Sequence, residues 1–266
     1  MKDILSEIVA HKRAEIDALK QTASIDTLYR DATPHRHIPF SHAIETTPCG
    51  IIAEFKRRSP SKGWIHRDAE PAAIARGYAA AGAAAISVLT DEKYFGGTLS
   101  DLQAVRPAAG IPLLRKDFTI DEYQLHQAAA AGADAILLIA AALSPDKCRQ
   151  LARTAHELGL ETLLEVHSAG ELEYLSDDID VVGVNNRCLG TFHTDTAVSE
   201  YLAPMMPQYI THISESGIRG AADIVRLQRL SYRGFLIGEL LMKGEDPAEN
   251  LARLTAETAE LQAARP

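Results

Sequence analysis

The sequence predicts an α/β protein, a (β/α)8 TIM barrel with an N-terminal helical extension. From residue 50 onward, eight apolar strand-like runs alternate with helix-like segments. These eight units occupy about 220 residues, which is within the usual size range of such a barrel. The runs are almost continuously apolar, as expected for parallel strands that are covered on both faces. We therefore expect a single barrel domain over residues 1–266, with residues 1–48 as the extension.

The first twenty residues, MKDILSEIVAHKRAEIDALK, carry charges every few positions and apolar side chains at helical spacing. This pattern indicates an amphipathic helix and differs from that of a signal peptide. A polar stretch with prolines at positions 34, 39 and 48 separates this helix from the first strand. The predicted strands then follow at 51–55, 84–89, 111–118, 133–140, 160–166, 181–186, 209–216 and 234–240.

Segments rich in Ala, Leu, Glu, Gln and Arg lie between the strands, and several begin near Asp, Ser or Thr and end at Gly, as helix caps require. The clearest span 71–82, 119–132, 144–159 and 218–230. The phrases AAGAAAISV at 80–88 and AAGADAILL at 130–138 nearly repeat, which indicates a duplicated βα unit. A doubly wound sheet has the same alternation, but eight strands are the closing number and no GxGxxG follows the first strand. We therefore favour a closed barrel.

Composition restricts the partners of this chain. The net charge of -9 argues against a nucleic-acid surface, and the local basic cluster within 56–62 suggests a small anion instead. The three cysteines form no CxxC pattern, so we expect a reduced compartment and no structural zinc. The longest apolar run, 135–143, is shorter than the roughly 20 residues that span a bilayer. We expect a cytoplasmic monomer without nucleic-acid or membrane partners.

Polar residues gather where the predicted strands end, and in a closed barrel these carboxyl-terminal ends converge on one mouth. The residues at these ends are Glu54, Lys56, Lys116, Glu165, Asn185, Arg187 and Glu215. Any one of them is more often a solvated strand end or an internal salt bridge. The two lysines and three glutamates of this set, around one cavity, are costly as structure alone, because charged groups are seldom buried unpaired. Such crowding separates pKa values, as acid and base catalysis requires.

The loops after strands seven and eight are expected to bind a phosphate. They contain Ser216 and Gly217 in the first case and Gly238 and Glu239 in the second. In barrels of this type, backbone N–H groups of these loops and a helix N-terminus often hold a phosphate. Lys56, Ser59 and Ser61 in the loop after the first strand would add a cation and hydroxyls. The predicted substrate is therefore a phosphorylated small molecule.

Neither a metal nor a cofactor is expected. His35 and His37 form an HxH pair, and Glu165 with His167 resembles half of a metal site, but no third ligand stands nearby in sequence. Four aromatic residues lie at or just past strand ends, where they could hold an aromatic substrate or simply pack. They are Trp64, Tyr94, Phe95 and Phe118.

Seven motifs together resemble those of the indole-3-glycerol phosphate synthase family. They are AEFKRRSPSKG (53–63), VLTDEKYFGG (88–97), LLRKDF (113–118), LLEVH (163–167), GVNNR (183–187), SESGI (214–218) and FLIGELLM (235–242). The N-terminal helix also fits this family. The resemblance implies cofactor-free ring closure of 1-(2-carboxyphenylamino)-1-deoxyribulose 5-phosphate, with loss of carbon dioxide and water, in tryptophan biosynthesis.

The resemblance also implies roles for individual residues. Lys116 would protonate the alkoxide that forms on ring closure, and Lys56 would be the second acid. Glu54 or Glu165 would be the base, and the sequence leaves this choice open. Glu215 would orient a lysine or a hydroxyl.

The remaining roles implied by the resemblance concern substrate binding. Asn185 and Arg187 would contact the sugar hydroxyls and support Glu165 or the substrate carboxylate. Phe118, together with Trp64, would line the anthranilate side. The phosphate would bind backbone N–H groups of the loops after strands seven and eight, with no part expected for the Glu239 side chain. The sequence departs from the family at Arg58, where a small residue is usual, and at Leu240, where a Ser is usual.

Three other functions are possible for such a barrel. Phosphoribosylanthranilate isomerase has a similar phosphate site, but its family has a Cys and an Asp where this chain has Glu54 and Glu165. A Schiff-base aldolase could use Lys116 or Lys56 as its nucleophile. A non-catalytic barrel is disfavoured because it would have no physical reason to retain so costly a cluster of charges.

Overall fold

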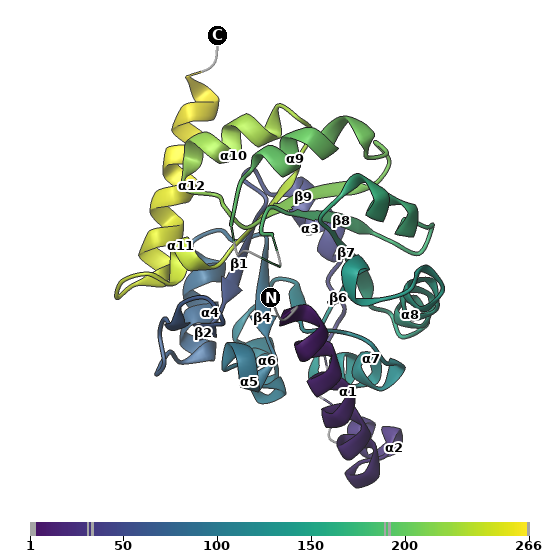
Figure 1. Ribbon diagram of the computed structural model, residues 1–266. Coiled ribbons are helices and arrows are strands. Elements are labelled where there is room, and N and C mark those ends of the chain that lie inside the picture. Colours follow the sequence, from purple (N-terminus) through teal and green to yellow (C-terminus); the bar gives the residue numbers. More distant parts are fainter. Residues whose placement is uncertain (1–3, 31, 33–34, 189, 191–192, 265–266) are drawn as a thin grey trace.

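Eight parallel strands close into a barrel, as the sequence predicts. The structure is a computed structural model that describes residues 4–30, 32, 35–188, 190 and 193–264. Around the barrel the strands follow chain order, and the last pairs with the first (Figure 1). The barrel strands are β1 (Ile51–Phe55), β4 (Ala85–Leu89), β5 (Leu113–Lys116), β6 (Ala135–Ile139), β7 (Glu161–Val166), β8 (Val181–Asn185), β9 (Thr211–Glu215) and β10 (Gly234–Ile237).

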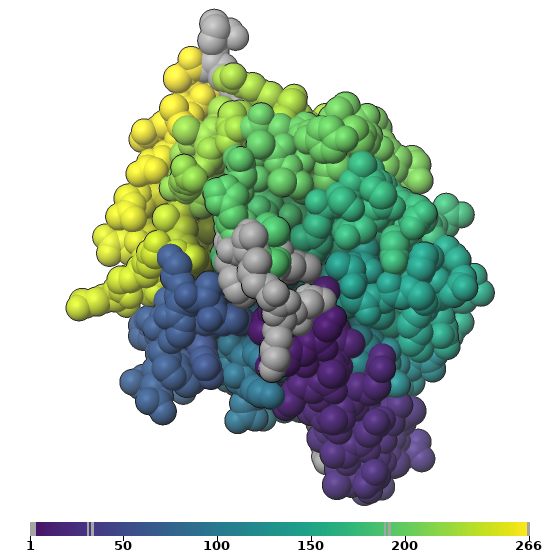
Figure 2. Space-filling model, viewed as in Figure 1, coloured from purple at the N-terminus to yellow at the C-terminus, as the bar shows by residue number. Residues whose placement is uncertain are grey.

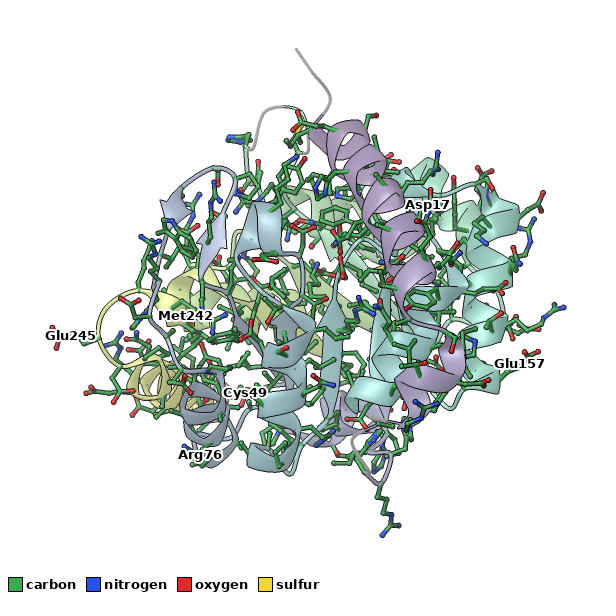
Figure 3. All side chains as sticks on the ribbon, turned by 90° about the horizontal axis from the view of Figure 1, so that it is seen from below. Asp17, Cys49, Arg76, Glu157, Met242 and Glu245 are labelled. Carbon is green, nitrogen blue, oxygen red and sulfur yellow. The ribbon has the colours of Figure 1, made fainter. Side chains whose placement is uncertain are left out.

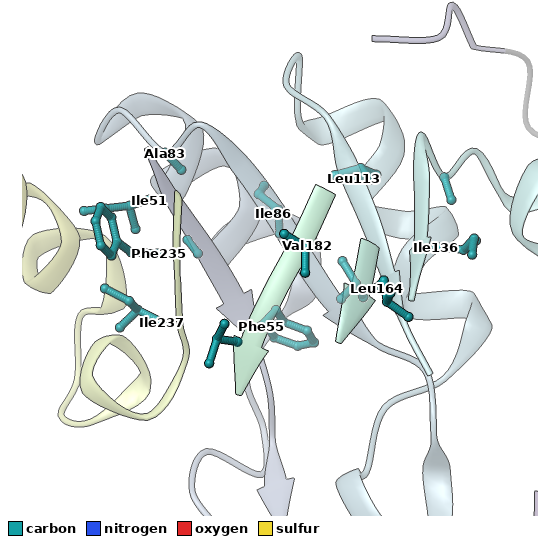
Figure 4. Close-up of a cluster of buried hydrophobic side chains, with 14 of the residues drawn as sticks. Ile51, Phe55, Ala83, Ile86, Leu113, Ile136, Leu164, Val182, Phe235 and Ile237 are labelled. Atoms are coloured by element: carbon teal, nitrogen blue, oxygen red, sulfur yellow. The ribbon is translucent and has the colours of Figure 1, made fainter. Parts of the chain in front are cut away.

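Burial on both faces of the sheet explains the continuous apolar runs. Ile52, Leu114 and Leu163 belong to a cluster inside the barrel. Their neighbours in sequence point outward into a second, larger cluster between the strands and the helices. Figure 4 shows part of this outer layer, including Ile51 and Phe55. The side chains on the inner face and those on the outer face of the sheet are therefore both shielded from water.

The predicted helices form, with boundaries set by their caps. Asp121 caps one helix through a capping box with Gln124, and Gly132 ends that helix in the left-handed conformation. The first predicted segment is helical from Pro71 onward, whereas the helices in the other three begin one to three residues inside their segments, because a cap residue is not itself helical. The helices after β1 are α4 (Pro71–Ala80), α5 (Glu92–Phe95), α6 (Leu99–Val105), α7 (Glu122–Ala131), α8 (Pro145–Glu157), α9 (Ala197–Leu202), α10 (Ala221–Gln228), α11 (Glu239–Met242) and α12 (Pro247–Ala263). Short 3-10 turns add η1 (Arg106–Ala108), η2 (Ala140–Ala142), η3 (Ala169–Tyr174) and η4 (Ala203–Met205).

The N-terminal extension is helical, as predicted, and it packs on the barrel. It consists of α1 (Ile4–Thr22), α2 (Ile25–Arg30) and α3 (Phe40–Thr46). In Figure 2 the purple N-terminal segment packs against the teal segments, and Figure 3 shows α1, marked by Asp17, from another side. Phe40 and Ile44 on α3 join the cluster inside the barrel, and Glu161 accepts hydrogen bonds from the N–H groups of Phe40 and Ser41, both at 2.8 Å. The third helix therefore closes the end of the barrel where the strands begin.

The loop after β1 contains a small hairpin that the sequence analysis did not predict. It pairs β2 (Arg58–Ser59) with β3 (Gly63–Trp64) in antiparallel register. Gly63 takes a left-handed φ of 67°, which a glycine adopts without steric cost. Strands of two residues are too short to produce an alternating pattern in sequence. None of the helices within the described residues is both long and apolar enough to cross a membrane.

Candidate active site

A cavity of about 610 Å³ opens at the carboxyl ends of the barrel strands. With the exception of Trp64, the structure brings the catalytic and substrate-binding candidates of the sequence analysis to its wall. These are Glu54, Lys56, Ser59, Lys116, Phe118, Glu165, Asn185, Arg187, Glu215, Ser216, Gly217, Gly238 and Glu239. Strand ends far apart in the chain supply them, so closure of the barrel is what creates the site.

Lys116 stands at the centre of the charged groups. Its Nζ donates to Oε2 of Glu165 at 2.9 Å and to Oε2 of Glu215 at 3.2 Å. Burial alone would lower the pKa of Lys116, but Glu165 and Glu215 outweigh that effect and raise it. Lys116 is therefore an ammonium ion that can donate a proton to an oxygen placed before it.

The two carboxylates beside Lys116 have opposite properties. Burial raises the pKa of Glu215, and the charge of Glu165 adds to that rise. Burial would also raise the pKa of Glu165, but Lys116, His167 and Asn185 outweigh it and lower that pKa. Neighbouring carboxylates whose pKa values are driven apart are typical of acid and base catalysis.

Two glycines make room for the carboxylates. A Cβ atom on Gly238 would lie 2.3 Å from Oε1 of Glu54, and one on Gly183 would lie 2.2 Å from Oε1 of Glu215. Gly183 was not singled out in the sequence, although a glycine inside a strand signals a close approach. Glu54 in turn accepts a hydrogen bond from Nζ of Lys56 at 2.5 Å, so a second lysine–glutamate pair faces the cavity.

One end of the cavity combines cations with an unusual backbone conformation. Ser216 and Gly217 have φ values of 65° and 76°, and such a conformation in a residue other than glycine is uncommon. Arg219 and Lys243 line the cavity near them, although sequence reasoning missed both. Their positive charges mark this end as the place for an anion.

The side chain of Glu239, for which no part in phosphate binding is expected, has a lysine partner on each side. It accepts hydrogen bonds from Nζ of Lys62 at 2.5 Å and lies 3.0 Å from Nζ of Lys243. Burial would raise the pKa of Glu239, but the two lysines lower it to about 2. Glu239 thus ties the hairpin loop to the end of α11. Arg187 contacts the same loop through Oγ of Ser61 at 3.5 Å.

The opposite end of the cavity is apolar. The rings of Phe95 and Phe118 lie 6.1 Å apart, and both line the cavity. The amino-terminal end of α1, near the middle of the barrel in Figure 1, adds Ile4, Leu5 and Ile8 to this wall. Such a surface suits a flat aromatic ring.

Trp64 does not line this cavity, so the expectation for it was wrong. Its side chain is 47% exposed and lies beneath the guanidinium groups of Arg58 and Arg67. Arg58, an unusual residue for the family, also donates to the Lys93 carbonyl, and it therefore braces the loop outside the cavity. Tyr94 is buried away from the cavity and donates to Glu7 of α1. Leu240, the second departure, lines the cavity.

No metal-binding group is found among the residues that the structure describes. Their His, Cys, Asp and Glu side chains form no group of three that could hold an ion. His37 lies 3.6 Å from Asp134 and 3.7 Å from Glu161, where it helps to hold the segment before α3.

Comparison with known proteins identifies the family. The family model for indole-3-glycerol phosphate synthase matches residues 5–254. A protein of that name from Bacteroides thetaiotaomicron is 54% identical over 255 residues, which cover 94% of this chain and 97% of the relative. The chain belongs to the indole-3-glycerol phosphate synthase family. A second relative of that name, from Kineococcus radiotolerans, is 43% identical and covers 99% of both chains.

Membership in the indole-3-glycerol phosphate synthase family makes this chain a carboxy-lyase of tryptophan biosynthesis, as the seven motifs implied. The solved structures support the fold alone. A mutant tryptophan synthase alpha-subunit from Pyrococcus furiosus aligns with a TM-score of 0.60 at 15% identity, covering 79% of this chain and 97% of that one. The structure described as native KDPGal aligns with a TM-score of 0.56 at 14% identity, over 80% of this chain and 94% of that one.

Proposed function

We propose that this protein converts 1-(2-carboxyphenylamino)-1-deoxyribulose 5-phosphate to indole-3-glycerol phosphate, carbon dioxide and water. The observation that carries the proposal is the place of Lys116, an ammonium ion held by two buried glutamates in a cavity with an apolar and a cationic end. The aromatic ring fits the end with Phe95 and Phe118, and the phosphate fits the end with Ser216 and Gly217. The sugar carbonyl then lies between them, within reach of Lys116.

The first chemical step joins the two halves of the substrate. The ring carbon that bears the carboxylate attacks the C2 carbonyl carbon, and the carbonyl electron pair moves onto oxygen. Lys116 donates its proton to that oxygen, which becomes a hydroxyl group. The bond to the carboxylate then breaks, carbon dioxide leaves, and its electron pair restores the aromatic ring. Holding the ring against the carbonyl in one cavity lowers the entropic barrier to this attack.

The second chemical step forms the pyrrole ring. The hydroxyl leaves as water with a proton from Lys56, and a base removes the proton from the carbon beside the nitrogen. Two protons are donated and one is taken up by the protein, so one proton is consumed overall, which balances the negative charge lost when the carboxylate leaves as neutral carbon dioxide. Both lysines lie at the cavity wall with a glutamate in contact.

Glu165 is our candidate for the base. Before the reaction, Lys116 and His167 hold its pKa low. Once Lys116 has given up its proton, it no longer stabilises the charge on Glu165, whose affinity for a proton therefore rises. Glu54 stays paired with charged Lys56 until the water is formed. Asn185 supports Glu165 from the next strand, and Arg187 on the rim is placed to meet the sugar or the substrate carboxylate.

The test is to mix the purified protein with this substrate and follow the fluorescence of the indole product. We expect product from the wild type and a loss of about 100-fold or more in kcat for Lys116→Met, because the acid is removed. Lys147→Met, at a half-buried position on α8 that does not line the cavity, is the matched control and should retain full activity. The proposal would be overturned if the wild type bound a non-reactive substrate analogue but formed no product from the substrate itself. Covalent trapping of the substrate by borohydride would favour an aldolase instead.

The whole chain is proposed to act as one catalytic domain, as a monomer in the cytoplasm, on this phosphorylated small molecule. In support, β1, β5, β7 and β9 of one chain supply the charged groups, and α1 supplies part of the apolar wall. Light scattering at the concentration of the activity assay tests the monomer. A dimer whose dissociation abolishes activity would contradict it.

A further inference from the structure

His167 lies directly behind Glu165 and is not part of the cavity wall. It follows β7, and its side chain is only 14% exposed. Its Nε2 lies 3.4 Å from Oε1 of Glu165, and its Nδ1 lies 3.6 Å from Oε2 of Glu171 on η3. Neither ring nitrogen makes a hydrogen bond of good geometry to any described residue. The imidazole therefore sits between two carboxylates, and its contact with them is chiefly electrostatic.

Glu171 fixes the position of the His167 ring through contacts with both the backbone and the side chain of that residue. The N–H of His167 donates to Oε2 of Glu171 at 2.6 Å, the same oxygen that faces Nδ1. Glu171 thus holds both the main chain and the ring of His167. A buried ring fixed in this way cannot turn away from Glu165 without losing that contact.

The charges around the ring favour its protonated form. Glu165 on β7, Glu171 on η3 and Glu215 on β9 all act on it. Burial lowers the pKa of His167, but the contacts with Glu171 and Glu165 outweigh burial and raise it. Lys116 on β5 holds the other oxygen of Glu165, so a cation stands on each side of this carboxylate.

We propose that His167, as an imidazolium ion, is a positioning residue for Glu165. It holds Oε1 while Lys116 holds Oε2, which fixes the plane of the carboxylate. When Lys116 gives its proton to the substrate, His167 is the cation that remains on Glu165 and keeps it ionised until the last proton is removed. The inference rests on the proposed function, in which Glu165 is the base.

The test compares His167→Gln with the wild type across a range of pH. A base must be ionised to act, and the nearby cation lowers its pKa. Its removal should therefore move the acid limb of the kcat profile up by about one pH unit. We expect kcat at the optimum to fall about tenfold or more, because the carboxylate loses its alignment. KM should change less than about twofold, because His167 does not touch the cavity.

Two further variants separate this role from simple destabilisation. His156→Gln is the matched control, because His156 lies between Asp178 and Asp180 far from the cavity, and it should leave the profile unchanged. Glu171→Gln keeps the imidazole but removes one of its carboxylates, and it should move the acid limb in the same direction by a smaller amount. A His167→Gln variant that folds and keeps the wild-type limb and kcat would overturn the proposal.

A measurement independent of catalysis tests the same contact. NMR of the His167 ring carbons should show that it titrates above the ordinary value of 6.5, and Glu165→Gln should lower its pKa. If the wild type forms no indole product, the proposed function fails while this titration still reports on the pair. If product forms but the ring titrates below 6.5, or if Glu165→Gln leaves the pKa of His167 unchanged, the role of His167 is refuted.

Discussion

Replacement of Lys12 by methionine should destabilise the docking of α1 on the barrel. The Lys12 side chain is 1% exposed, and its Nζ lies 2.9 Å from Asp91, 3.1 Å from Asp117 and 3.2 Å from Glu15. Burial alone would lower the pKa of Lys12, but these carboxylates outweigh it and raise that pKa. Asp117 stands between Lys116 and Phe118 in sequence and lines the cavity with them, so this cluster also holds part of the cavity wall in place.

The expected loss follows from the charges that would be left behind. Removing one partner of a buried ion pair costs about 3–5 kcal/mol, because the remaining charge is uncompensated. Asp117 would keep Arg115 at 2.9 Å and the hydroxyl of Thr90 at 2.8 Å, and Asp91 would keep the N–H of Tyr94. The loss in the free energy of unfolding should therefore lie near the lower limit, at about 3 kcal/mol.

Urea denaturation measures this loss, and limited proteolysis detects release of α1 while the barrel stays folded. Arg13→Met is the control, because the neighbouring Arg13 is on the exposed side of the same helix. If Lys12→Met changed the free energy of unfolding by less than about 0.5 kcal/mol and left α1 protected, the cluster would not hold the helix.

The same variant should change the response to acid. Burial would raise the pKa of Asp117, but Arg115 and Lys12 outweigh it and lower that pKa from 3.8 to about 2. A lowered carboxyl pKa contributes stability above 3.8 that is lost as the pH falls through about 2. Without Lys12 the pKa of Asp117 rises. The free energy of unfolding of the variant should therefore change less than that of the wild type as the pH falls from 3.8 to about 2.

Two other predictions concern Glu215. Gly183→Ala would place a Cβ 2.2 Å from Oε1 of Glu215, so kcat should fall about tenfold or more. Gly110→Ala is the control, because a Cβ at Gly110 would have no neighbouring atom within 4 Å. Equal kcat values in both variants would show that the Glu215 side chain moves aside without loss of activity. Because burial raises the pKa of Glu215 above 4.5, its contribution to stability is present below 4.5 and is lost as pH rises through the folded value. Glu215→Gln should remove this loss, about 1.4 kcal/mol per unit of raised pKa, and parallel urea-stability curves for variant and wild type would contradict the prediction.

The sequence alone determined the barrel and the residues at its mouth. Strand period, helix caps and segment length are local properties, so eight βα units could be recognised without any long-range information. Closure then follows from the number of strands, and it places residues such as Lys116 and Glu165 at one end. The seven motifs supplied the family because they preserve order along the whole chain.

Only the tertiary structure decided how these residues are paired. Lys12 and Asp117 are 105 positions apart in sequence, yet their charged groups lie 3.1 Å apart. The need for Gly183, the exclusion of Trp64 from the cavity and the contact of His167 with Glu165 depend likewise on approach between side chains. The strength of a charge interaction varies with distance and burial, and neither quantity is written in the local pattern of a sequence.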